Sequence, residues 1–289
     1  MKRSKGEKIF GVFNGLILII LAIIALYPFI YVIVASFSDP MEVASGHVWL
    51  YPIGINLSAY EEVIHYEGIW VAYANTFFYA IVGTLVSIVV TILGAYPLSK
   101  KRLRGKTIFT FLIAFSMWFQ AGMIPTYLNF KDLGLLDTRT AIIVGFCVTA
   151  FYLFIMRTYF TSLPDALEES AKLDGANDFQ ILLQIYLPLA IPSVVTLMLY
   201  YLVDRWNAYF WAMTLLKDES KIPLQVILNK LIVEGNWSEQ TGALTDSVEY
   251  NQETLKYATI VVAIIPVLCV YPVLQKYFVK GMTVGAIKG

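Results

Sequence analysis

The sequence predicts an all-α integral membrane protein with six transmembrane helices. Its 289 residues are 58% hydrophobic and only 15% charged, and the mean hydropathy is +0.67, which is too apolar for a soluble domain. A helix that crosses about 30 Å of hydrocarbon needs roughly 20 mostly apolar residues, because lipid cannot satisfy a bare backbone. The runs that qualify cover about residues 9–37, 71–98, 108–130, 140–160, 185–216 and 255–278.

Interruptions of these runs are expected to be kinks. Pro28, Pro125, Pro192 and Pro266 lie inside or near the runs, and neighbouring helices can satisfy the backbone carbonyls that a proline frees. The first run is too long for a secretory signal, and no small-residue cleavage pattern follows it, so we expect a retained helix. The fifth run is the least uniform. We therefore expect one membrane domain over residues 1–289, without extra loops inside its helices.

The distribution of Lys and Arg predicts the orientation, because short cytoplasmic loops hold the positive charge. The loop over residues 38–68 has no Lys or Arg but five Asp or Glu residues, so it is expected outside. The N-terminal segment, the second and fourth loops and the end of the chain carry basic residues and lie on one side in a six-helix count. Both termini are therefore expected in the cytoplasm. These basic residues are Lys2, Arg3, Lys5, Lys8, Lys100, Lys101, Arg102, Arg104, Lys106, Arg157, Lys172, Lys276, Lys280 and Lys288.

Two outer segments have helical features. Residues 56–58 follow the turn residues Pro52 and Gly54 and are expected to open a short helix. In the segment over residues 217–254, apolar residues from Ile222 to Ile232 recur at helix-like spacing. We expect a short outer-surface helix followed by a polar loop.

The loop over residues 161–184 predicts a helix-turn-helix on the cytoplasmic face. Ser162, Pro164 and Asp165 form a helix-start pattern, and the acidic residues that follow favour the positive end of the backbone dipole. Gly175 suits the left-handed position that ends a helix. Asp178 is placed to start a second short helix.

The segment from Glu169 to Pro188 resembles the EAA loop of ABC-importer permeases. It reproduces both the residue types of that pattern and the spacing from glycine to the Leu-Pro pair. Ser170 stands where the pattern usually has a second alanine, which is a small-for-small change. The matching residues are Glu169, Ala171, Asp174, Gly175, Ala176, Ile185, Leu187 and Pro188.

The resemblance implies the type I ABC importer permease fold and a coupling helix that docks into a cleft on the ATP-hydrolysing subunit. Gly175 would give the sharp bend, Ala171 and Ala176 would permit close approach, and Glu169 and Asp174 would supply polar anchors or caps. The implied partners are a homologous second permease, an ATPase dimer that uses ATP and Mg, and an external solute-binding protein. The implied location is a bacterial cytoplasmic membrane. A solvated connector is the alternative interpretation of this loop.

The similarity is strongest to the carbohydrate branch, the maltose-type permeases and relatives that import oligosaccharides. It extends to Asn75-Thr76, Gly94 to Ser99, Gly134 to Thr138, Trp206-Asn207 and the segment from Gln275 to Gly289. In the maltose-type system the matching C-terminal tail enters the interface between the ATPase subunits. By resemblance, the tail over residues 279–289 would place Lys280, Gly281 and Lys288 there; a frayed tail is the alternative.

Polar side chains inside the runs are candidates for the sugar path, because they cost free energy in hydrocarbon unless they face a cavity or a partner helix. Arg205 is the clearest case, and a mutual contact with Asp204 or a place near the outer interface would be the structural explanation. Helix-to-helix hydrogen bonds are the alternative for the amide residues. The path candidates are Arg205, Trp206, Asn207, Tyr209, Gln120, Asn129 and Asn75.

This sequence lacks the residues that several other functions require. Gly105-Lys106-Thr107 mimics a phosphate loop without its first glycine, so we expect the partner to bind ATP and this chain to bind no cofactor. His47 and His65 are too isolated to indicate a metal site. A membrane enzyme would need a nucleophile and base, or paired carboxylates, in the helices, and a secondary transporter often shows inverted repeats. An ABC permease for peptides or amino acids is the nearest alternative. No nucleic-acid partner is expected.

Overall fold

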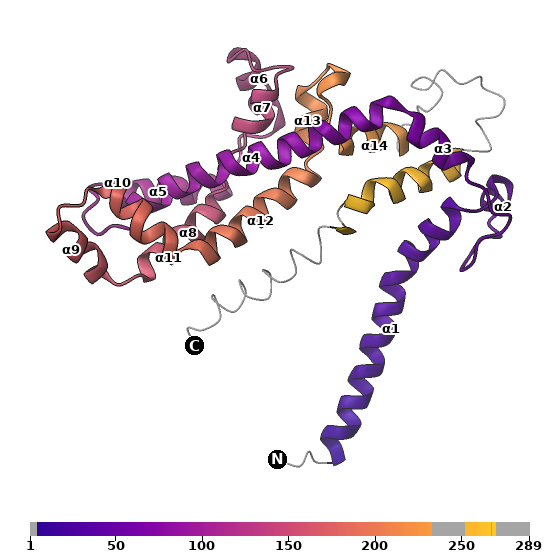
Figure 1. Cartoon of the computed structure of the whole chain (residues 1–289), viewed down its shortest axis with the longest axis horizontal. Helices are drawn as coiled ribbons and strands as arrows, with labels where there is room; N and C mark the ends of the chain where they lie inside the picture. The colour runs from indigo at the N-terminus through magenta and orange to yellow at the C-terminus, as the bar shows by residue number, and fades with distance from the viewer. Residues whose placement is uncertain (1–4, 233–251, 267, 270–289) are drawn as a thin grey trace. The chain divides into compact units, whose positions relative to one another are not determined.

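The computed structural model describes residues 5–232, 252–266 and 268–269, and in these every regular element is helical. The chain divides into two units. One unit contains Met1–Glu67 with Leu228–Val267, and the other contains Gly68–Ile227 with Leu268–Gly289. The elements are drawn in Figure 1.

The first unit contains three N-terminal helices, α1 (Lys5–Ser36), α2 (Pro40–Ala44) and α3 (Ser58–His65), and a helix over residues 252–266. The predicted helix after Asn56 is therefore confirmed as α3. α1 is apolar on all sides, and none of its membrane-length window is buried. Its C-terminal end joins a small core in which the rings of Tyr31 and Tyr257 meet edge to face at 5.6 Å.

The second unit is built along α4 (Glu67–Ser99), a 33-residue helix that continues beyond the predicted run. A core cluster joins the C-terminal half of α4 to α8 (Ala150–Ser162), α9 (Asp165–Leu173) and α12 (Ile191–Asn207). α8 also packs against α5 (Lys106–Trp118). The unit's other elements are α6 (Met123–Asp132), α7 (Arg139–Val144), α10 (Asp178–Ile181), a π-helical segment (Leu182–Tyr186), α11 (Leu187–Leu189), α13 (Phe210–Leu215), a 3₁₀ turn (Glu219–Lys221) and the start of α14 (Leu224–Ile232).

The third predicted run, residues 108–130, differs from the expected single helix. It forms α5 and α6, which are bent by 118° at the break between them. Phe119 leaves the helix with an extended backbone, and Gly122 takes φ +85°, a value that suits glycine because it lacks a Cβ. Pro125 lies inside the second helix and therefore does not cause the break.

The fourth and fifth predicted runs are also interrupted. Residues 145–149 separate α7 from α8. In the fifth run the helices on either side of Ala190 are bent by 82°. Pro188 and Pro192 flank this point, and neither can donate an i to i−4 hydrogen bond. Pro192, which was expected to kink a continuous helix, thus accompanies a break here.

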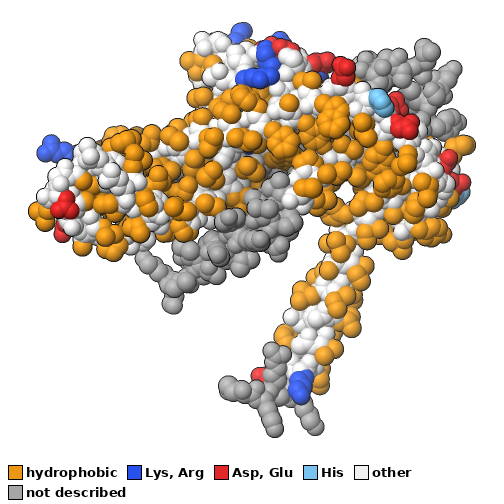
Figure 2. Space-filling model, in the orientation of Figure 1, with side chains coloured by type: hydrophobic (Ala, Val, Ile, Leu, Met, Phe, Trp, Pro, Cys, Tyr) orange, Lys and Arg blue, Asp and Glu red, His pale blue; other side chains and the backbone are white. Residues whose placement is uncertain are grey.

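The described residues contain two helices that are individually long and apolar enough to cross a membrane, or up to four if each bent pair counts as one span. Figure 2 shows hydrophobic side chains over most of the described surface on the face drawn. Such a surface suits lipid and helix partners better than water.

Candidate functional site

The segment that resembles the EAA loop forms α9, a turn and α10. α9 begins at Asp165. Pro164 occupies the N-cap position and makes no side-chain hydrogen bond to the helix. Ser162, the first residue of the predicted helix-start pattern, is instead the last residue of α8, and its hydroxyl donates to the carbonyl of Tyr159 at 2.7 Å. The expected second helix is present as α10. Asn177 caps α10 in a reciprocal capping box with Gln180.

Gly175 ends α9 in the left-handed conformation, with φ +83°. Its N–H donates to the carbonyl of Lys172 at 3.0 Å, and the N–H of Ala176 donates to the carbonyl of Ala171 at 2.9 Å. This pair of bonds is the Schellman arrangement, which satisfies the last carbonyls of a helix. The predicted bend at Gly175 is therefore present.

A buried ion pair attaches α9 to the end of α4. The side chains of Glu168 and Lys100 are 12% and 8% exposed, and their charged atoms lie 2.6 Å apart. Lys172 also donates to Glu168, and the Tyr186 hydroxyl lies 3.4 Å from the same carboxylate. The Lys100 ammonium lies over the Tyr186 ring at 3.5 Å from its centroid, a favourable cation–π geometry.

Burial raises the pKa of the Glu168 carboxyl, but hydrogen bonds from Lys100 and Lys172 and the attraction of their charges outweigh it. The net result lowers this pKa to about 2. Glu168 is therefore ionised at neutral pH and can anchor both cations.

Three further ion pairs join the loop after α4 to α9 and α10. Arg102 lies 3.5 Å from Glu168. Lys101 lies 2.7 Å from Asp165 at the start of α9, and Arg102 contacts Asp178 at the start of α10. From the sequence, Lys100, Lys101 and Arg102 indicated only the orientation of the chain, and Glu168 had no predicted partner. The sequence did contain a signal for these pairs. Three consecutive cations lie between the second and third hydrophobic runs, and acidic residues lie near the start of the loop over residues 161–184.

The EAA-type residues divide between a buried and an exposed face. Ala171 is buried in the core cluster, and Ala176 packs against that cluster. Glu169, Asp174 and Pro188 are exposed. The exposed face also carries Leu173, which is 90% exposed, one turn after Glu169. Leu173 and Glu169 are therefore both accessible on this face of α9.

Arg205, the clearest of the path candidates, is held by backbone carbonyls near the end of α7. Its guanidinium donates to the carbonyls of Ile142, Ile143 and Phe146, at the C-terminal end of α7 and just beyond, and to the Ser87 hydroxyl. Of the two structural explanations, a mutual contact with Asp204 is not formed, and Asp204 instead accepts from the Tyr152 hydroxyl at 2.8 Å. Arg205 thus supplies donors to carbonyls exposed by the break after α7.

The other path candidates fall into two groups. Trp206 is buried against Phe77 with ring centroids 5.3 Å apart. Asn75 is buried, donates to the carbonyls of Ser220 and Ile222 and accepts from Arg139. These two side chains hold the unit together. Asn207, Tyr209, Gln120 and Asn129 are exposed.

We expect Arg205→Met to destabilise the protein by about 2 kcal/mol, because three backbone carbonyls lose a charged donor. Thermal unfolding of the detergent-solubilised complex would measure this loss. Asn207→Ala is the matched control, since Asn207 is exposed and donates only to Val203 within its own helix. A variant with unchanged stability and weakened substrate affinity would instead assign Arg205 to the path.

The tail residues Lys280, Gly281 and Lys288 lie outside the described residues, as does most of the polar loop predicted before the last run. Among the described residues, no group of three or more His, Cys, Asp or Glu is arranged to hold a metal ion. His47 contacts Glu42 at 2.8 Å on the surface.

Comparison with known proteins identifies relatives across nearly the whole chain. Residues 68–284 match the family described as binding-protein-dependent transport system inner membrane component. The polygalacturonan/rhamnogalacturonan transport system permease protein YtcP of Bacillus subtilis (strain 168) is 41% identical over 277 residues, covering 94% of this chain and 96% of that protein. Protein LplC of the same organism is 37% identical over 289 residues, covering 100% of this chain and 98% of that protein.

Solved structures agree with the sequence relatives. A chain of a bacterial ABC transporter involved in the import of the acidic polysaccharide alginate is 47% identical, with a TM-score of 0.89, and the match covers 96% of this chain and 99% of that chain. A chain of the alginate ABC transporter in complex with an alginate pentasaccharide-bound periplasmic protein is 15% identical with a TM-score of 0.55, and shares the fold alone. The resemblance to importer permeases is thus confirmed, and this chain is a non-enzymatic transport component of the inner membrane that belongs to the family of binding-protein-dependent transport system inner membrane components.

Proposed function

We propose that this chain is one of two permease subunits of an ABC importer for acidic oligosaccharides. The observation that carries the proposal is α9, an EAA-type helix fixed to the end of α4 by the Lys100–Glu168 pair and exposing Leu173 outward. The substrate class is supported by the relatives, because polygalacturonan, rhamnogalacturonan and alginate all contain uronic acids.

The proposed topology has six spans with both termini in the cytoplasm. Two long helices and two bent pairs account for up to four spans among the described residues. In this topology the remaining two spans are the fourth run, which is interrupted, and the sixth run, which includes most of the helix over residues 252–266. The loop with Lys100 to Lys106 and the α9 segment then lie on the same cytoplasmic side, which agrees with their ion pairs.

The proposed mechanism is alternating access driven by a separate ATPase dimer. ATP and Mg are bound by that dimer, and this chain binds no cofactor. Closure of the dimer moves α9, and the ion pairs of Glu168 and Asp165 transmit the movement to the end of α4. The core contacts of Ala171 transmit it to α8 and to the segment before α12. The cavity formed with the second permease opens outward and receives sugar from the external binding protein, and hydrolysis resets it.

We expect Leu173→Ser to weaken assembly with the ATPase subunit by about tenfold or more, because burying a leucine contributes roughly 1.5–3 kcal/mol. Titration of the purified permease pair with the ATPase subunit would measure this. Leu50→Ser is the control, since Leu50 is also exposed but lies in the loop expected outside. Equal affinity for both variants would exclude α9 as the docking helix.

The function is tested by purifying the chain from its native membrane and identifying the proteins that accompany it. We expect a second permease and an ATPase, with hydrolysis stimulated by binding protein loaded with galacturonate or alginate oligomers. Stimulation by neutral oligosaccharides alone would keep the importer and reject the acidic substrate. Recovery as a lone stable protein would reject the importer and reopen the membrane-enzyme and secondary-transporter alternatives.

A further inference from the structure

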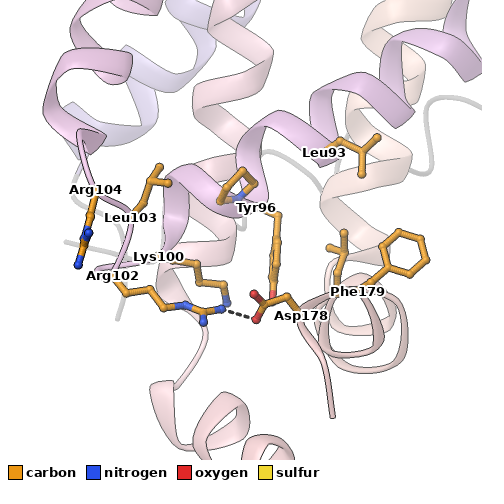
Figure 3. Close-up of a pocket in the computed structure, with 10 residues that line it drawn as sticks. Leu93, Tyr96, Lys100, Arg102, Leu103, Arg104, Asp178 and Phe179 are labelled. Carbon is orange, nitrogen blue, oxygen red and sulfur yellow. Dashed lines mark hydrogen bonds and ion pairs between the residues drawn. The ribbon is translucent and has the colours of Figure 1, made fainter.

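A cavity of about 440 Å³ lies between the end of α4, the loop after it and the start of α10. Figure 3 shows that its lining is divided by chemistry, with the cations of the loop at one side and Leu93 and Phe179 at the other. It lies apart from the exposed face of α9. Of the residues that line it, the proposed mechanism uses only Lys100.

The polar side of the cavity carries three cations against one carboxylate. Lys100 is paired with Glu168. Arg102 contacts Asp178, the carboxylate that lines the cavity, and also lies 3.5 Å from Glu168. Arg104 makes no hydrogen bond or ion pair with any residue that the structure describes, and its side chain is exposed. The cavity therefore presents one uncompensated guanidinium, that of Arg104, beside a second that shares its charge with Asp178 and Glu168. A guanidinium binds phosphate oxygens well, because its donors form a planar fork.

The other side of the cavity is apolar and open. Leu93 is 50% exposed and Phe179 is 61% exposed. Leu93 precedes Lys100 by two helical turns, or about 10 Å along the axis, so it lies deeper in the expected membrane than the cations. Exposed apolar side chains continue from it along one face of α4 at intervals of four residues, at Val89, Leu85 and Ile81.

A ligand that fits this cavity has an anionic head and an apolar chain and comes from the membrane. We propose that the cavity binds an anionic phospholipid, with its phosphodiester at Arg104 and Arg102 and an acyl chain against Leu93 and Phe179. Basic pockets at the cytoplasmic ends of transmembrane helices suit such headgroups. A small soluble phosphate would leave the apolar side in water, so the lipid is the better match. This proposal goes beyond the transport function, because lipid binding does not require import to occur.

The test uses the complete transporter complex in nanodiscs of phosphatidylcholine with a trace of photoactivatable phosphatidylglycerol. We expect labelled peptides from the end of α4 and the start of α10. Arg104→Gln should reduce this labelling about fivefold, because one cation near the surface is worth about 1 kcal/mol toward anionic lipid. Lys131→Gln is the matched control, since Lys131 is an exposed cation on α6, away from the cavity, and labelling should be unchanged.

Two further arms separate the possible ligands. Leu93→Trp should fill the apolar side and lower labelling without removing a charge. This variant tests the proposal even if Arg104→Gln folds poorly. Glycerol 3-phosphate at millimolar concentration should not compete. Competition by it would overturn the lipid proposal in favour of a soluble phosphate. Labelling that is equal in all variants, or cross-links from this region to the partner subunits in place of lipid, would overturn it as well.

Discussion

We expect Gly175→Val to abolish uptake while membrane insertion stays intact. Gly175 has φ +83°, and a β-branched residue is strongly disfavoured in this left-handed region. A valine there would break the two hydrogen bonds that close α9 and would redirect α9 relative to α10. The helix would then present Leu173 and Glu169 at the wrong angle to the ATPase. Oligouronate uptake by cells and the amount of chain in the membrane fraction would be measured together.

The matched control for Gly175→Val is Gly134→Val. Gly134 has φ +67°, and like Gly175 it has no atom within 4 Å of an added Cβ. The backbone strain is therefore similar, but Gly134 follows α6 and is not part of α9 or α10. We expect Gly134→Val to keep uptake and Gly175→Asn to restore most of it, because Asn tolerates the left-handed region. Normal uptake by Gly175→Val would contradict the coupling role of this bend.

We expect Glu168→Ala to destabilise the complex by about 3 kcal/mol, because it leaves the buried Lys100 ammonium unpaired. The cost is larger than for an exposed pair, since both side chains are almost covered. Lys101 and Asp165 provide the exposed comparison, and Asp165→Ala should cost less than 1 kcal/mol. Thermal or denaturant unfolding of the purified complex measures both values.

A double variant and pH test the same pair further. Lys100→Met with Glu168→Met should recover much of the stability, because no buried charge is left. Burial raises the pKa of Glu168, but the two lysines lower it to about 2 in the folded state, compared with 4.5 ordinarily. Its contribution is therefore complete above about pH 4.5 and disappears as the pH falls toward 2. A double variant as unstable as Glu168→Ala, or an equally acid-sensitive Glu168→Ala, would reject the pairing.

Local signals in the sequence were sufficient for the membrane class and for the local conformation of α9 and α10. The membrane class follows from composition and run length, and these do not depend on how the helices pack. The left-handed bend at Gly175 and the short helix after Asn177 are decided by neighbouring residues, and both are present. The family followed from the spacing between Gly175 and Pro188, which the relatives support.

The tertiary structure alone decided the partners of the charged residues and the breaks in the helices. Glu168 meets Lys100 across 68 positions of sequence, and Arg205 meets the carbonyl of Phe146 across 59. Hydrophobic periodicity records which face of a helix is covered, but it does not record which side chain covers it. The break at Gly122 was not predicted for a related reason. The run stays apolar through the residues that leave the helix, and apolar character does not indicate the direction of the backbone.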